Sequence, residues 1–126
     1  MNDAPANSAS WIQIAVLEEF QGQRQIMRVV GGLEVLLLRV GGDIIAVNNH
    51  CTHLGKSLQG GRIMGTQLTC PFHGACFDLK SGAALSGPAV APLHLFPARI
   101  DGENILVDLS KRPGKSTIGF GGDGPV

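Results

Sequence analysis

The 126-residue chain has few aromatic and few charged side chains. It contains five phenylalanines, one tryptophan and no tyrosine. A surface on which successive nucleic-acid bases stack is therefore not expected. Ten basic residues balance ten acidic residues, so the formal net charge is zero. Without a basic excess, neither nucleic acid nor an anionic membrane is indicated as a partner.

Long hydrophobic runs are also missing. The run LEVLLLRV at 33–40 is far too short to cross a bilayer. The polar start, MNDAPANSAS, lacks the charged-then-apolar pattern of a signal peptide. We therefore expect a soluble, cytoplasmic protein. Its three cysteines are an odd number, and in a reducing compartment clustered thiols are more often metal ligands or reactive groups than a disulfide framework.

Short apolar segments separated by glycines make up much of the sequence. Hydrophobic residues account for 44% of the chain, which is enough for a core and argues against disorder. The segments 24–30, 33–40 and 43–48 are joined by the pairs Gly31-Gly32 and Gly41-Gly42. Such pairs are typical of β-hairpins, because glycine accepts the positive φ of tight turns.

The first apolar segment, WIQIAV at 11–16, alternates in part. This pattern predicts a strand with Ile12, Ile14 and Val16 on one face. A short helical turn around residues 17–20 is expected to follow, and the sequence shows no longer helical period.

The last apolar segments, 93–100 and 105–109, are separated by DGEN and predict another hairpin. The chain is therefore expected to be all-β, either an antiparallel sandwich or a small barrel. We predict one globular domain at 11–110. Flexible tails are expected at 1–10 and 111–126, where glycine, proline or small polar residues predominate.

All three cysteines and three of the four histidines fall within residues 48–78. Four of them form two mixed pairs. Cys51 and His53 are separated by one residue, and Cys70 and His73 by two, with sixteen residues between the pairs. Each pair supplies one thiolate and one imidazole.

Four kinds of site can be weighed for these residues. Ordinary burial explains cysteines, but histidines are unusual in a core. Two thiolates and two imidazoles suit structural zinc, although zinc loops usually pair cysteine with cysteine and histidine with histidine. A catalytic Cys–His pair would leave the second pair unexplained. An iron–sulfur cluster in which two histidines replace two cysteines on one iron fits the mixed pairing directly. The residues favour the last kind of site and leave the others open.

The pattern C-x-H, sixteen residues, C-x-x-H resembles the motif of Rieske [2Fe–2S] proteins. HCTHLGKSL is similar to their first cluster loop and CPFHGACFDLKSGAAL to the second. GPAVAPLHLFPARIDGENILVDL is similar to their proline-containing third loop and final hairpin. The resemblance covers about residues 11–110. It implies a Rieske fold with a cluster-binding subdomain at about 49–92.

The resemblance also implies a ligand set for one [2Fe–2S] cluster per chain. Cys51 and Cys70 would hold the buried iron, whereas His53 and His73 would hold the outer iron and reach the surface. In the same loops, Gly55 and Gly74 would let the backbone approach the cluster closely. Residues 87–92 would cover the cluster from a third side.

The chain departs from Rieske proteins of respiratory and photosynthetic complexes. Those proteins carry an extra cysteine in each loop, joined as a disulfide, where this chain has Lys56 and Phe72. They also place Ser and Tyr hydroxyls near the cluster sulfurs, where this chain has Ala75 and Phe77. Losing those hydrogen bonds destabilises the reduced cluster, so we predict a potential at or below about −100 mV. Cys76 is predicted to be a small buried hydrophobe.

The resemblance implies a low-potential electron carrier, not an enzyme. The chain would be a stand-alone ferredoxin for aromatic catabolism, passing single electrons from an NAD(P)H-dependent flavin reductase to a terminal Rieske oxygenase. We expect a monomer that docks transiently near His53 and His73, with Leu54 and Pro88 in the docking patch.

Two other functions remain open. One is an accessory subunit of another reductase, such as the small subunit of an assimilatory nitrite reductase. The other is a cluster-free interaction module. Of the two remaining histidines, His50 is expected near the cluster rim or in solvent, and His94 is expected to be structural or on the surface.

Overall fold

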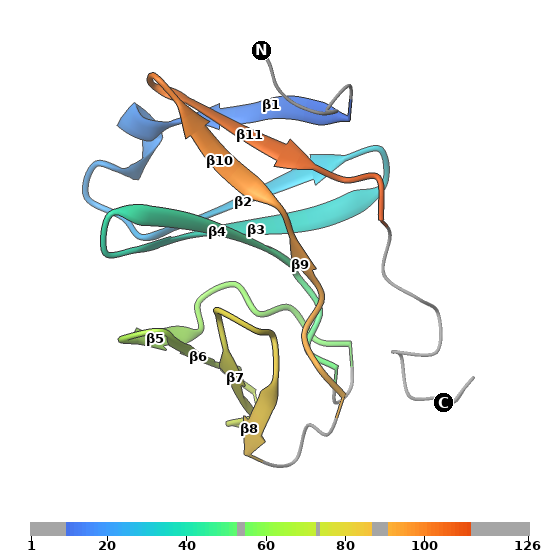
Figure 1. Ribbon diagram of the computed structural model, residues 1–126. Coiled ribbons are helices and arrows are strands. Elements are labelled where there is room, and N and C mark those ends of the chain that lie inside the picture. The colour runs from blue at the N-terminus through green and yellow to red at the C-terminus, as the bar shows by residue number, and fades with distance from the viewer. Residues whose placement is uncertain (1–9, 53–54, 73, 87–90, 112–126) are drawn as a thin grey trace.

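The computed structural model describes residues 10–52, 55–72, 74–86 and 91–111. These residues form antiparallel strands and one 3-10 turn (Figure 1). In chain order the elements are β1 (Trp11–Val16), η1 (Leu17–Phe20), β2 (Gln25–Val30), β3 (Leu33–Val40), β4 (Asp43–Asn48), β5 (Arg62–Met64), β6 (Gln67–Thr69), β7 (Cys76–Asp78), β8 (Ala84–Ser86), β9 (Leu95–Phe96), β10 (Ala98–Asp101) and β11 (Asn104–Asp108). Within the described residues, no helix is long and apolar enough to cross a membrane.

The strands form three sheets, and the four-stranded sheet β2-β3-β4-β9 lies between the other two (Figure 1). On one side of it lies the three-stranded sheet β1-β11-β10, and on the other the four-stranded sheet β5-β6-β7-β8. The all-β, antiparallel class expected from the sequence is confirmed. Two apolar cores result, one on each side of the central sheet.

Strand β3 is a nearly continuous apolar run because side chains on both of its faces are buried. Successive side chains in a strand point to opposite faces. Val35 and Leu37 pack with the β1-β11-β10 sheet, whereas Leu36 and Leu38 pack in the core beside β5-β6-β7-β8. All four side chains are fully buried. Each contributes about 1.5–3 kcal/mol of burial free energy, so an alternating pattern would leave one core unfilled.

The two glycine-paired hairpins are confirmed. Val30 pairs with Leu33 across the first turn, and Val40 pairs with Asp43 across the second. Gly31 has a φ of 57°, in the left-handed region that these tight turns require. The predicted helical turn after the first strand is also confirmed, as η1.

Strand β1 does not present the face predicted for it. A register shift between Gln13 and Ala15 interrupts its pairing with β11. A bulge inserts one extra residue and so breaks the alternation of faces. As a result Ala15 is buried, while Ile12 is 41% exposed. The prediction of a regular alternation that puts Ile12, Ile14 and Val16 on one face is therefore wrong.

The single strand predicted at 93–100 is two strands in different sheets. Leu95 pairs with Val47 in the central sheet, whereas Ala98 pairs with Val107 in the outer sheet. Pro97 stands between them and has no N–H to donate to a ladder. The proline therefore ends one pairing and lets the chain cross between the sheets.

The sheet β5-β6-β7-β8 was not predicted as strands. Each of its strands has three residues, which is too short for a periodic pattern. The sheet lies below the central sheet in Figure 1 and adjoins the two loops that hold the predicted ligands. The predicted tails fall almost entirely outside the described residues, so the domain boundaries stay predictions.

Candidate metal centre

The two cysteine-containing loops share one backbone hydrogen-bond pattern. In each loop the cysteine N–H donates to the carbonyl five residues later, and the N–H four residues later donates back to the cysteine carbonyl. The same local fold therefore presents each cysteine at the start of a tight loop. The bonds are Cys51 to Lys56 (2.7 Å), Gly55 to Cys51 (2.7 Å), Cys70 to Ala75 (2.7 Å) and Gly74 to Cys70 (3.2 Å).

Gly55 and Gly74 are required in these loops by their backbone conformation. Their φ angles are +73° and +77°, in the left-handed region that other residues enter at a cost. A Cβ built on either glycine would meet no other described atom within 4 Å. The prediction that these glycines leave room for a cluster stays a prediction.

Cys51 and Cys70 lie in the core between the central sheet and β5-β6-β7-β8. They are only 2% and 3% exposed and pack with Leu58, Leu68 and Phe77. A thiolate buried among apolar side chains needs a compensating cation. Two buried thiols at equivalent loop positions therefore fit an iron–sulfur cluster, which is held by thiolates.

The predicted imidazole ligands, His53 and His73, lie outside the described residues. So do Leu54 and Pro88 of the predicted docking patch, together with most of the predicted third loop. In the part of the chain that the structure describes, no three His, Cys, Asp or Glu side chains form a metal-binding group. That part contains only the cysteine half of the predicted ligand set.

A buried asparagine, missed in the sequence analysis, anchors the first loop. Asn49 is 1% exposed, and its Nδ2 donates to Glu34 Oε1 (3.1 Å) and to Ser57 Oγ (3.0 Å). Its Oδ1 accepts from the N–H of Leu58 (3.0 Å). The network joins β3 to the residues before and after the loop. The available signal was a polar residue at the end of the buried strand β4.

The two histidines that are not predicted as ligands, His50 and His94, each lie within hydrogen-bonding distance of a backbone carbonyl. His50 Nδ1 lies 3.0 Å from the carbonyl of Gly55, and its Nε2 lies 3.9 Å from Glu34 Oε2. It therefore helps to close the first loop. His94 Nε2 donates to the carbonyl of Lys111 (2.9 Å), and its ring meets that of Phe96 edge-on at 4.7 Å. These contacts favour the structural alternative of the two that were expected for His94, structural or on the surface.

Lys56 and Phe72, the two residues expected at the positions of the disulfide cysteines of respiratory and photosynthetic Rieske proteins, contact each other. The Lys56 Nζ lies 5.7 Å from the centroid of the Phe72 ring. Lys56 is exposed, and Phe72 is 57% exposed. A cation over an aromatic face at this distance is worth about 0.5–1 kcal/mol at an exposed site. A weak noncovalent contact thus joins the two loops.

The residues that follow the second loop carry few donors. Ala75 and Phe77 are fully buried, and neither has a side-chain hydrogen-bond donor. Cys76, between them, is half-buried, and its Sγ donates to Gln67 Oε1 (3.4 Å). The prediction that Cys76 is buried is therefore wrong. In strand β7 Phe77 points into the core, so its neighbour points away from it.

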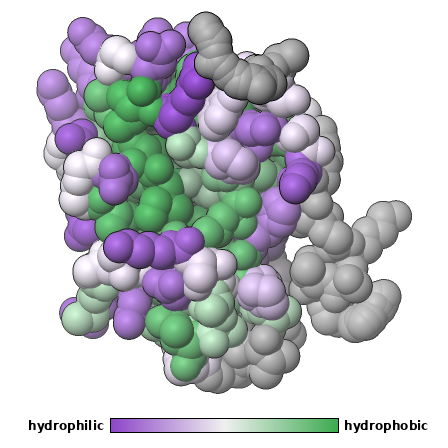
Figure 2. Space-filling view, in the orientation of Figure 1, coloured by the Kyte–Doolittle hydropathy of each residue, from purple (hydrophilic) through white to green (hydrophobic). Residues whose placement is uncertain are grey.

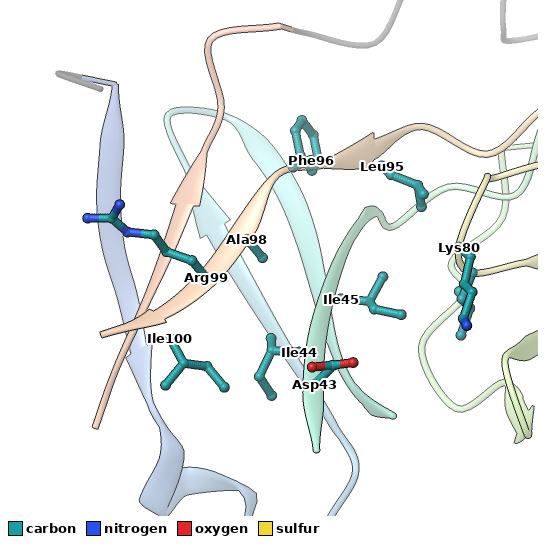
Figure 3. Close-up of a pocket in the computed structure, with 10 residues that line it drawn as sticks. Asp43, Ile44, Ile45, Lys80, Leu95, Phe96, Ala98, Arg99 and Ile100 are labelled. Atoms are coloured by element: carbon teal, nitrogen blue, oxygen red, sulfur yellow. The ribbon is translucent and has the colours of Figure 1, made fainter. Parts of the chain in front are cut away.

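A groove of about 500 Å³ lies elsewhere, between β4, β9, β10 and the turn after β7. Figure 2 shows hydrophobic residues gathered in this region with hydrophilic residues around them. Ile45 and Leu95 line the groove, together with the charged side chains of Asp43, Lys80 and Arg99 (Figure 3). Of the predicted metal ligands that the structure describes, Cys51 and Cys70, neither lines it. The candidate centre therefore remains at the two loops.

Residues 10–97 match the family model of the Rieske [2Fe-2S] domain. The chain is 33% identical over 100 residues to the ferredoxin component of the naphthalene 1,2-dioxygenase system of Pseudomonas aeruginosa, covering 79% of this chain and 96% of that protein. It is 35% identical over 86 residues to the ferredoxin subunit of 3-phenylpropionate/cinnamic acid dioxygenase of Shigella boydii, covering 68% of this chain and 81% of that one.

Solved structures agree with this assignment. The ferredoxin of carbazole 1,9a-dioxygenase from Nocardioides aromaticivorans matches with a TM-score of 0.72 and 29% identity, covering 79% of this chain and 97% of that one. A chain from the complex of reduced oxygenase and oxidised ferredoxin in carbazole 1,9a-dioxygenase matches with a TM-score of 0.74 and 27% identity, covering 85% and 100%. The chain therefore belongs to the Rieske [2Fe–2S] family, and its cofactor is a Rieske-type [2Fe–2S] cluster.

Proposed function

We propose that this chain is the ferredoxin component of an aromatic-ring dioxygenase system, an electron carrier and not itself an oxygenase. The carrying observation is the similarity to ferredoxin components. The chain is 33% identical to a naphthalene-system ferredoxin component and covers 96% of it. It is 35% identical to a ferredoxin subunit of a 3-phenylpropionate/cinnamic acid dioxygenase and covers 81% of it.

Four residues are proposed as the cluster ligands. Cys51 and Cys70 would hold the buried iron, and His53 and His73 the outer iron. The shared hydrogen-bond pattern of the two loops and the burial of both thiols support this set. When bound, the cluster accepts and releases one electron at a time. The chain's own residues keep water from the thiolates and fix the two loops around them.

The partners are proposed to be a flavin-dependent, NAD(P)H-oxidising reductase and a terminal oxygenase. A similar chain occurs in a complex of reduced oxygenase and oxidised ferredoxin, which supports the second partner. The carrier is also proposed to be a cytoplasmic monomer that contacts each partner briefly. Docking is proposed near His53 and His73, with Leu54 and Pro88 in the docking patch.

Reconstitution tests this function. The protein isolated from aerobic expression should be red-brown, with about two irons and two sulfides per chain. Added to NADH, a flavin reductase and a terminal oxygenase, it should be required for hydroxylation of an aromatic substrate. A colourless or zinc-containing protein would contradict the cluster. A cluster-bearing protein that supports only nitrite reduction in its native complex would favour the accessory-subunit alternative.

A further inference from the structure

The Lys56–Phe72 contact has a distinctive chemical character. In the two loops, 51–56 and 70–75, Lys56 is the only side chain with a fixed formal charge. Phe72 is a large apolar side chain that remains 57% exposed. It immediately precedes His73, one of the proposed outer ligands. A cation and an apolar aromatic ring, lying 5.7 Å apart, thus follow or precede the proposed outer ligands by one to three residues in the sequence.

The neutral chain is also electrically polarised. Residues 49–92 carry three basic side chains and one acidic side chain, a formal charge of +2. Residues 10–48 and 93–111 carry five basic and seven acidic side chains, a formal charge of −2. The remaining terminal residues cancel. The single carboxylate of the positive half, Asp78, is hydrogen-bonded to Ser81. The three cations of that half are Lys56, Arg62 and Lys80, and all three are exposed.

We propose that Lys56 and Phe72 form the recognition element by which this carrier docks on its terminal oxygenase. The complementary face carries a carboxylate opposite Lys56 and an apolar contact for Phe72. This inference rests on the proposed function. It adds the sign of the charge at the docking surface, which is positive, and names the two residues that contact the oxygenase. Complementary charge orients the approach, and burial of the ring holds the complex.

Charged small oxidants test the field at the electron exit without any protein partner. The reduced protein is oxidised by ferricyanide, an anion, or by hexaammineruthenium(III), a cation. Each oxidant takes one electron from the cluster and becomes ferrocyanide or hexaammineruthenium(II). At low ionic strength, Lys56→Glu should slow the ferricyanide reaction about fivefold and accelerate the ruthenium reaction, because like charges repel. In about 1 M salt, where the screening length is about 3 Å, both effects should disappear.

Lys80→Glu is the matched control, because it makes the same change of charge in the same half of the chain. Lys80 lines the groove shown in Figure 3. Lys80→Glu should change both rates less than Lys56→Glu does, because Lys80 lies in neither cysteine loop. Equal effects of the two substitutions, or none from Lys56→Glu, would overturn the inference while leaving the carrier function intact.

The second test measures electron transfer from the reduced protein to the terminal oxygenases of the naphthalene and carbazole systems. Lys56→Glu should slow transfer about five- to tenfold at low salt. Phe72→Ala should slow it by a similar factor at any salt concentration, because its contribution is apolar. Val29→Ala, in the central sheet and 63% exposed, is the apolar control and should have no effect.

Iron content and midpoint potential are measured for every variant. Lys56→Gln and Phe72→Leu replace any variant that loses its cluster. The inference would be refuted if the electron-transfer rates of the variants changed only as their midpoint potentials do. It would also be refuted if the variants were reduced more slowly by the reductase but passed electrons to the oxygenase at an unchanged rate. Failure of the unaltered, cluster-bearing protein to reduce either oxygenase would count against the proposed function and the inference together.

Discussion

Gly55 and Gly74 occupy equivalent positions in two loops that are far apart in sequence. Each follows a cysteine by four residues, donates its N–H to that cysteine's carbonyl and has a left-handed φ, +73° and +77° respectively. The two loops therefore share one local backbone conformation, and each begins with a buried thiol. The equivalence supports the proposal that both cysteines serve one metal centre.

Alanine at either glycine should destabilise its loop. Gly55→Ala and Gly74→Ala are each expected to cost about 1–2 kcal/mol, because an L residue is strained at these φ angles. Urea unfolding and the rate of iron release to a chelator measure the two consequences. Gly42→Ala is the control, since Gly42 has no positive φ and open space around its Cβ position. Equal tolerance at Gly55 and Gly42 would contradict the requirement.

Serine substitution should separate the cysteines by role. Cys51→Ser and Cys70→Ser should yield protein with little or no cluster, because each removes a proposed thiolate ligand. Cys76→Ser should retain a full complement of iron and sulfide, since this half-buried thiol bonds to Gln67. Iron and sulfide analysis with visible absorption decides the outcome. A cluster lost from Cys76→Ser alone would refute the assignment.

The reduction potential should be low and should respond to added hydroxyls. A redox titration is expected to give a midpoint at or below about −100 mV. Ala75→Ser should raise it by on the order of tens of millivolts if the new hydroxyl donates to a cluster sulfur. Phe77→Tyr should also raise the midpoint potential if its hydroxyl donates to a cluster sulfur. If the buried hydroxyl has no acceptor, the substitution should cost about 1–3 kcal/mol of folding stability. A clearly positive midpoint for the unaltered protein would contradict the low-potential assignment.

Asp78 should make stability depend on acid pH. Its carboxylate accepts from Ser81 Oγ (2.6 Å) and from the Ser81 N–H (3.2 Å), and the Ser81 side chain holds the pKa of Asp78 below its usual 3.8. A depressed pKa means that the ionised form is favoured in the folded state. The stabilisation is therefore present above about pH 4 and is lost as pH falls through the folded-state pKa.

The comparison of Asp78→Asn with the unaltered protein measures this effect. The urea midpoint of Asp78→Asn should be lower at pH 7, and the difference should shrink as the pH falls below the usual aspartate pKa of 3.8. In a Ser81→Ala background the same substitution should have less effect, because the main hydrogen-bond partner is already gone. A difference that grows on acidification would contradict the sign.

Asn49 should matter more than a surface asparagine. Asn49→Ala would leave the buried N–H of Leu58 without its acceptor, at a cost of about 1–3 kcal/mol. Iron release should also accelerate, because the network flanks the first loop. Ser57→Ala, which removes one bond of the network, should show a smaller effect. Unchanged iron release in Asn49→Ala would confine the role of Asn49 to folding.

Some features of this fold could be predicted because they depend on neighbours in the chain. The glycine pairs predicted the β2–β3 and β3–β4 hairpins, since the turn conformation is a property of two residues. The spacing of Cys51 and Cys70, with a histidine following each, indicated the kind of centre. Its cysteine half lies buried in equivalent loops, and the histidine half stays a prediction.

Other features depend on residues distant in sequence, and only the tertiary structure decided them. The bulge at Gln13 follows from pairing with β11, and the division of 93–100 follows from Pro97 meeting two different sheets. The Lys56–Phe72 contact joins two loops that are separated in the sequence by strands β5 and β6. The sequence by itself thus determined local turns and the chemistry of the candidate ligands. Folding decided which side chains meet, because such contacts depend on how the sheets stack and not on local conformational preference.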